Sequence, residues 1–381
     1  MDSLFDYEFP VIVLPKELTL DAICKVFQAI NTTGLRLSAF DICVAKFMPS
    51  GINLREKLKA AMEEDSVRIA LDGDETAILQ TVALLSGIHP KKNKLADNLR
   101  QDDVDSWWDK AVSGFDYAIK TLDNFGCGCS KNLSLLPYRP MLPIIAAIYV
   151  KKDIESLRAP KPAEIEQKIK TFFFCASLSS RYTEGTDQKI TDDYTHLMRW
   201  IDGGSPPSFI ADGIKWSTSA FIKAKTGAIA STILCIINSC SPKDFYSDKT
   251  VGLGSNVEDC DKHHIFPKAK YQADNKELIE SIFNKTFLTK ESNVFIKDKS
   301  TRDYFYELIQ THGWKEDTGK ARFSEHFINE ATFQAFINED YDKFLKLRAE
   351  EIKNHLKLNI GITIHDVDQS LIDDEDLDDD E

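Results

Sequence analysis

The residues whose types and spacing best suit chemistry are two adjacent histidines, His263 and His264, followed by the sequence Ile-Phe-Pro. This short apolar run predicts a strand over 263–266, and neighbouring side chains on a strand point to opposite faces. One imidazole can therefore bind a metal ion while the other accepts a proton from water at neutral pH. Hydrolysis of a phosphodiester needs such a base, together with a divalent cation that neutralises the phosphate and stabilises the leaving oxygen.

Two asparagines extend this pattern. Asn284 stands at the start of a predicted strand over 285–289, and Asn293 lies nine residues further on, in a helix expected to begin at about residue 290. A loop and a helix over 275–283 are expected to join the two strands. A pair of adjacent histidines alone is common and seldom marks a site, but the pair together with both asparagines is much more specific.

The combination resembles the HNH, or ββα-metal, nucleases. The resemblance implies that His264 is the general base that activates water, and that Asn284 holds the loop carrying this base through hydrogen bonds. It implies that His263 and Asn293 bind one divalent metal ion. Positions where the family places basic contacts to phosphate are matched only loosely, by Lys268, Lys297, Lys299 and Arg302.

The identity of the metal ion is open at this point. Many members of the family carry Asp where this chain has His263. Imidazole accepts Mn²⁺, Ni²⁺ or Zn²⁺ more readily than Mg²⁺, which prefers oxygen ligands. We therefore expect one divalent ion, Mg²⁺ or Mn²⁺, with Ni²⁺ and Zn²⁺ as alternatives.

The resemblance extends beyond the histidines to the GmrSD-type, modification-dependent (type IV) restriction endonucleases. The matching segments cover most of the chain up to its acidic tail and are 27–42, 135–145, 172–182, 261–268 and 340–352. In that family a ParB/sulfiredoxin-like domain binds and hydrolyses a nucleotide, and an HNH domain cuts DNA in bacterial defence against phages with modified bases. The resemblance implies a DNA endonuclease with DNA as its partner.

The nucleotide domain of that family is mostly missing here. The sequence begins just before the Asn-Thr-Thr-Gly motif and lacks the acidic-Gly-Gln-Gln-Arg signature that precedes it in the family. We expect a fragment or a split system, in which a second protein supplies the missing domain. The residues Asn31, Thr32, Thr33 and Gly34 would then form a loop close to the partner or the nucleotide. A left-handed Gly34 that ends a helix explains the glycine equally well.

The fold class expected from these patterns is mainly α (α+β), with a helical domain followed by a second helical domain that contains the ββα motif. We divide the chain into a remnant of the ParB-like domain (1–50), a helical domain (51–204), an HNH endonuclease domain (209–365) and a disordered acidic tail (366–381). The boundary before 209 rests on the cluster of Gly and Pro in the sequence DGGSPPS.

The net charge of −14 is unusual for a protein that binds nucleic acid. Ten acidic residues lie in the last sixteen positions, and without them the charge is −14 + 10 = −4. A segment of this composition buries too little apolar surface to fold. It is either a solvating tail or one that mimics DNA or docks a basic partner.

We expect a cytoplasmic protein with no membrane partner. The longest apolar stretch, 229–240, is too short to span a bilayer, and no signal peptide is evident.

The scattered cysteines are expected to be free thiols, with a structural zinc at Cys127 and Cys129 as a weak alternative. Trp107 and Trp108 are expected to pack in the core, with base stacking as the alternative.

Two other classes of function remain open. The chain can be a subunit that binds DNA or a partner, with a nuclease site that is silent or activated by that partner. It can also be a regulator whose acidic tail holds a basic protein.

Overall fold

The computed structural model describes residues 37–252, 260–274 and 277–368, and four single positions before residue 37. The expected loop at Asn31, Thr32, Thr33 and Gly34, most of the expected 1–50 remnant and residues 369–381 of the acidic tail lie outside the described residues. The described chain is mainly helical with two small pairs of strands, which confirms the expected α+β class. None of its described helices is both long enough and apolar enough to cross a membrane.

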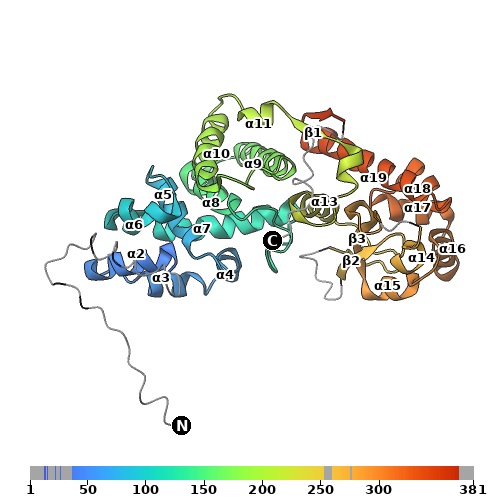
Figure 1. Ribbon diagram of the computed structural model, residues 1–381, viewed down its shortest axis with the longest axis horizontal. Coiled ribbons are helices and arrows are strands. Elements are labelled where there is room, and N and C mark those ends of the chain that lie inside the picture. Colours follow the sequence, from blue (N-terminus) through green and yellow to red (C-terminus); the bar gives the residue numbers. More distant parts are fainter. Residues whose placement is uncertain are drawn as a thin grey trace, which may run out of the picture.

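The first part of the chain is a stack of helices (Figure 1). Its longer helices are α2 (Ala39–Phe47), α3 (Leu54–Ala61), α4 (Asp65–Ala70), α5 (Thr76–Leu85), α7 (Gln101–Asn124), α8 (Met141–Lys152), α9 (Lys161–Leu178) and α10 (Thr186–Ile201), with the short α6 (Leu95–Asn98) before α7. α2 begins as predicted, because Ser38 accepts a hydrogen bond from the Asp41 amide and closes a capping box. α7 and α8 cross closely at Gly114, where a Cβ atom would lie 2.7 Å from the Ala146 carbonyl oxygen.

The second part carries the predicted ββα motif. It contains α11 (Ser208–Ala211), β1 (Ile214–Trp216), α12 (Thr218–Phe221), α13 (Gly227–Ser239), β2 (Cys260–His264), α14 (Lys268–Tyr271), β3 (Lys285–Thr289), α15 (Lys290–Ile296), α16 (Thr301–His312), α17 (Glu316–Ser324), α18 (Glu330–Ile337), α19 (Tyr341–His355) and β4 (Ile364–Asp366). β2 and β3 are antiparallel, and β3 is followed directly by α15. The bounds predicted for β3 and the start of α15 are confirmed.

The two parts of the chain share one hydrophobic core. α13 lies between α9 of the first part and β3 of the second (Figure 1). Its Asn238 side chain donates a 2.7 Å hydrogen bond to the Gly126 carbonyl. Gly126 has a φ of 91°, and a Cβ atom there would lie 2.0 Å from the Cys235 carbonyl oxygen, so only glycine lets the helix approach this turn. The expected boundary near 204–209 therefore separates segments of sequence whose cores are continuous.

Three details differ from the sequence-based expectations. The helix expected over 275–283 is wrong, because 277–280 form a turn that leads into a short 3-10 turn, Ile282–Asn284. β2 ends at His264 instead of Phe266. The ordered chain continues past the expected start of the tail at 366, since β4 pairs in parallel with β1 and Asp366 forms an ion pair with Lys353 at 2.7 Å.

A buried histidine, His326, links the ββα motif to the C-terminal helices. Its Nε2 lies 2.7 Å from the Lys243 carbonyl oxygen and its Nδ1 lies 2.6 Å from the Thr286 hydroxyl. A carbonyl only accepts, so Nε2 carries the hydrogen and Nδ1 accepts from Thr286. The ring is thus held neutral, and burial lowers the pKa of His326 from 6.5 to about 4.

We predict that the protein loses stability as the pH falls from about 6.5 to 4. In that window the unfolded chain binds a proton at His326 that the folded chain excludes, so stability is fully present above pH 6.5 and declines by up to about 3 kcal/mol on the way to pH 4. Urea unfolding at several pH values measures this slope. The slope should flatten in His326→Gln and stay unchanged in His196→Gln, whose side chain is exposed. Equal slopes in all three proteins would contradict the assignment.

Candidate functional site

The two histidines lie at the end of β2, beside the start of β3. His263 is opposite Thr286 and His264 is opposite Lys285 in the register of the two strands. Adjacent residues on a strand point to opposite faces of the sheet, so the two imidazoles project to opposite faces. Each imidazole shares its face with the residue directly opposite it on β3. Both rings are partly buried, and 24% of the His264 side chain is exposed. His264 is therefore accessible to a small reactant while its backbone is held in the sheet.

Asn284 closes the loop that follows His264. Its amide oxygen accepts a hydrogen bond from the Phe266 amide at 2.9 Å, and its amide nitrogen donates to the carbonyls of Phe266 and Ile279 at 3.2 and 3.0 Å. The Tyr304 hydroxyl donates to the Ile265 carbonyl at 2.9 Å. The fully buried Asn284 thus ties both ends of the 266–279 loop together, two residues beyond His264.

A carboxylate that the motif analysis missed contacts His264. Glu280 lies 3.2 Å from the Nε2 atom of His264, and it forms ion pairs with Lys268 at 2.7 Å and Lys285 at 2.9 Å. Burial raises the pKa of Glu280, but the hydrogen bonds from the two lysines outweigh this and lower the pKa to about 2. Glu280 is therefore ionised at neutral pH. No signal in the sequence singled it out, because it lies within the segment that was expected to be helical.

The ionised Glu280 determines which nitrogen of His264 is free. A carboxylate only accepts hydrogen bonds, so the Nε2 atom of His264 must carry the hydrogen that lies between them. Burial lowers the pKa of the His264 imidazole, an effect that Glu280 partly offsets, so the ring is neutral at pH 7. A neutral ring with hydrogen on Nε2 has its lone pair on Nδ1. The geometry therefore provides a proton acceptor at Nδ1.

The two expected metal ligands come from adjacent elements. His263 lies on β2, and Asn293 is exposed on α15, the helix that follows β3. The start of α15 is held by Thr289, which accepts from the Ser292 amide at 3.2 Å. It is also held by the buried Asp244, which accepts from the Ser292 hydroxyl at 2.7 Å. Sequence analysis also missed Asp244, which ties the segment after α13 to α15.

The side chain of His263 fits the role of a ligand. It makes no hydrogen bond to any residue that the structure describes, and its pKa is lowered by burial, which Asp261 and Asp244 partly offset. A neutral imidazole with a free lone pair, close to two carboxylates, suits a divalent cation. Within the described residues no group of three or more His, Cys, Asp or Glu is placed to hold a metal. Water and substrate oxygens would have to complete the coordination around His263 and Asn293.

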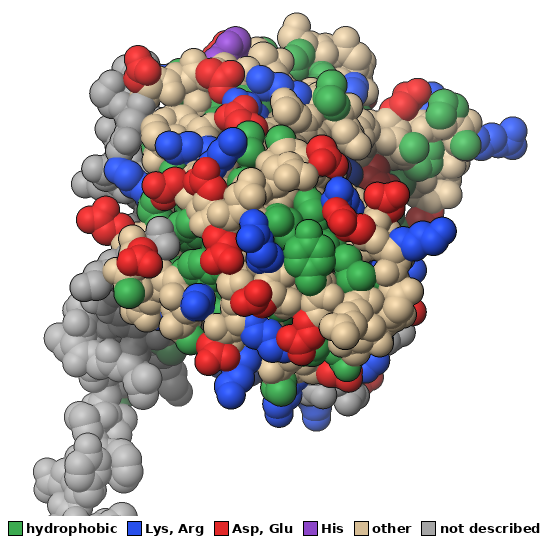
Figure 2. All heavy atoms as spheres, turned by 90° about the vertical axis from the view of Figure 1, so that its right-hand side faces the viewer, with side chains coloured by type: hydrophobic (Ala, Val, Ile, Leu, Met, Phe, Trp, Pro, Cys, Tyr) green, Lys and Arg blue, Asp and Glu red, His purple; other side chains and the backbone are tan. Residues whose placement is uncertain are grey.

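The four loosely matched basic residues differ in their surroundings. Lys268 is paired with Glu280, Lys299 is paired with Glu307 at 2.8 Å, and the Nε atom of Arg302 donates to the Ile337 carbonyl at 3.1 Å. Lys297 is exposed at the end of α15 and has no ion pair with any described residue. Figure 2 shows basic and acidic side chains interspersed on the end of the molecule that carries the C-terminal helices. The positive charge at this end is therefore largely matched by acidic neighbours.

The comparisons with known proteins give one relative at low identity. The chain is 27% identical to an uncharacterized protein of Methanocaldococcus jannaschii, in an alignment that covers 92% of this chain and 64% of the relative. The chain thus spans just under two thirds of the relative's length. No family model matches the chain, and no solved structure matches it.

We predict that His264 carries its hydrogen on Nε2 and that Glu280 is the reason. Nitrogen-15 NMR of the labelled imidazoles distinguishes the two neutral tautomers directly. His264 should be mainly the Nε2–H tautomer in the wild type and in Glu307→Gln, a matched control that removes a different lysine-paired glutamate of this part. Glu280→Gln should shift the tautomer balance or mobilise the ring. An unchanged His264 spectrum in Glu280→Gln would refute the assignment.

Proposed function

We propose that this chain is a metal-dependent HNH-type endonuclease that hydrolyses DNA phosphodiesters. The observation that carries the proposal is the clamp of Asn284 on the loop after His264, next to a neutral imidazole whose Nδ1 lone pair is free. These features match the roles that the resemblance to HNH nucleases implies for both residues. The archaeal relative is itself uncharacterized, so it contributes no activity to the proposal.

In the proposed reaction, Nδ1 of His264 takes a proton from a water molecule, and the resulting hydroxide attacks the phosphorus atom. The bond between phosphorus and the leaving oxygen breaks as the new bond forms. Glu280 keeps the ring oriented and stabilises the imidazolium that results, as a paired carboxylate does for other histidine bases. A divalent cation bound by His263 and Asn293 would neutralise the phosphate and the leaving oxygen.

We further propose that the chain works with a second protein in prokaryotic defence against phages. The support for a partner is the resemblance to a family in which an HNH domain works together with a nucleotide-binding domain. The net charge of −14 also opposes DNA binding by the chain alone, and a basic partner or Mg²⁺ would reduce that repulsion.

A second candidate is a subunit that binds DNA or a partner and has a nuclease site that is silent until activated. One observation favours it: Lys268 and Lys299, two of the expected phosphate contacts, are already paired with Glu280 and Glu307. A partner or substrate would have to compete for these lysines before they could contact phosphate.

We predict that purified protein cuts supercoiled plasmid or modified phage DNA when Mg²⁺, Mn²⁺ or Ni²⁺ is present. His264→Ala removes the base and should lower the rate on the order of 10²–10⁴-fold, whereas His196→Ala, an exposed histidine on α10, should not change it. Gel electrophoresis of time courses measures both rates. Equal cutting by wild type and His264→Ala would eliminate His264 as the base. No cutting of any substrate by the wild type would favour the second candidate.

A further inference from the structure

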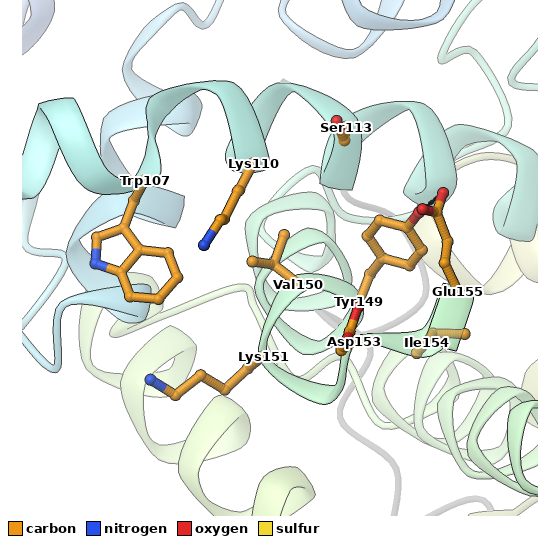
Figure 3. A pocket seen from close by; sticks show the side chains of 9 residues that line it. All are labelled: Trp107, Lys110, Ser113, Tyr149, Val150, Lys151, Asp153, Ile154 and Glu155. Carbon is orange, nitrogen blue, oxygen red and sulfur yellow. Dashed lines mark hydrogen bonds between the residues drawn. The ribbon is translucent and has the colours of Figure 1, made fainter. Parts of the chain in front are cut away.

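A hollow of about 430 Å³ opens on the helical part of the chain, where α7 and α8 pack (Figure 3). Trp107 and Lys110 reach it from α7, Tyr149 and Lys151 reach it from the end of α8, and Glu155 reaches it from the turn that follows. None of these residues belongs to the ββα motif. The hollow is therefore a feature separate from the candidate nuclease site.

The two adjacent tryptophans of α7 have different surroundings. Trp108 is 2% exposed and packs in the core, whereas Trp107 is only half-buried and lines the hollow. Successive side chains on a helix differ in direction by about 100°, so a core role for Trp108 leaves Trp107 at the surface. The structure thus confirms core packing for Trp108 and leaves a partly accessible aromatic ring at Trp107.

Two ammonium groups from different helices converge on this ring. The Nζ atoms of Lys110 and Lys151 lie 4.8 and 5.2 Å from the ring centroid of Trp107. Both lysines are exposed, and neither forms an ion pair with any residue that the structure describes. The Lys151 ammonium also donates a hydrogen bond to the Leu85 carbonyl at 3.4 Å. In a chain with a net charge of −14, two cations beside one ring, neither with a carboxylate partner among the described residues, make a local positive site. An anion attached to a planar group suits such a site, because the ring can stack and the ammonium groups can bind the charge.

The far side of the hollow carries two carboxylates, Glu155 and Asp153, and the Tyr149 hydroxyl. The Tyr149 hydroxyl donates a hydrogen bond to the Glu155 carboxylate, and the Tyr149 ring is stacked on Tyr117 with centroids 4.3 Å apart. Figure 3 shows the tyrosine and Glu155 at one end of the hollow and Trp107 with the lysines at the other. Carboxylates can accept hydrogen bonds from sugar hydroxyl or base amino groups.

We propose that this hollow binds a nucleotide, with its base stacked on Trp107 and its phosphate held between Lys110 and Lys151. The hydroxyl or amino groups of the nucleotide are directed toward Glu155 and Asp153. The same chemistry is offered by a free nucleotide and by an unpaired nucleotide in a DNA strand. This site does not depend on the nuclease proposal, because its residues and its binding readout are separate from His264.

The test is isothermal titration calorimetry of the full chain with ADP and with an oligo-thymidine of about 12 nucleotides, a length within the usual range for single-strand sites. Binding should weaken by about tenfold or more in Trp107→Ala, the loss expected when a stacked base loses its ring. Lys110→Ala and Lys151→Ala should weaken binding and reduce its dependence on salt. Circular dichroism checks that each variant is folded, and Trp107→Phe, which keeps an aromatic ring, should retain most of the affinity.

Trp200→Ala and Lys168→Ala are matched controls, because Lys168 lies 5.4 Å from the Trp200 ring at a different place on the helical part. These two variants should bind like the wild type. Binding of ADP alone identifies a free nucleotide as the ligand, and binding of the oligonucleotide identifies an unpaired strand. Failure of the wild type to bind either probe, or equal binding by wild type and Trp107→Ala, would overturn the proposal.

Discussion

The fully buried guanidinium of Arg348 is the interaction on which the candidate site depends. From α19 it donates to the carbonyls of Phe283 and Lys285 at 2.7 and 2.8 Å, and to the carbonyl of His326 at 3.0 Å. Burial lowers the pKa of Arg348 to about 9, so the group stays charged at neutral pH. Charged donors strengthen hydrogen bonds to carbonyls, and each buried carbonyl left without a donor costs about 1–3 kcal/mol. Arg348 therefore holds the two peptides on either side of Asn284.

A series of hydrogen bonds and ion pairs connects Arg348 to His264. Arg348 holds the backbone next to Asn284, and the Asn284 side chain in turn forms hydrogen bonds with the amide and the carbonyl of Phe266. The start of β3 then sets Lys285 opposite His264, where Lys285 and Lys268 hold Glu280 against the ring. The buried Arg348 thus helps to fix the position of the His264 imidazole, although the two side chains are joined only through the residues between them. This rigidity suits a site whose base must keep one nitrogen directed at a reactant.

The sequence was most informative where local signals were strong. β3 is a short run rich in β-favouring residues that is buried from Thr286 to Thr289, and Thr289 caps the next helix, so the bounds of both elements could be predicted. A helix was expected over 275–283 on local grounds, yet distant groups hold the described residues 277–283 in another form. The Tyr341 hydroxyl donates to the Leu278 carbonyl, and Asn284 donates to the Ile279 carbonyl. The pairing of β1 with β4 could not be predicted either. Each strand has three residues, and they are far apart in sequence.

In the candidate site, too, local features could be predicted from the sequence and features that depend on distant contacts could not. The spacing of His263, His264, Asn284 and Asn293 could be read from the sequence because the motif is local. Glu280 and Asp244 could not, because their importance comes from contacts that only the folded chain creates. The interspersed basic and acidic side chains on the end that carries the C-terminal helices are also invisible in a net charge, since their pairing depends on which acids lie beside which bases (Figure 2).

The most direct test of the proposed nuclease site is a crystal structure of the protein grown with Mn²⁺, in which anomalous scattering locates the ion. We expect one peak within about 2.5 Å of an imidazole nitrogen of His263 and of the amide oxygen of Asn293. That peak should be lost in His263→Ala. Crystals with the ββα motif ordered and no peak between these two side chains, or a peak held by other residues, would contradict the account.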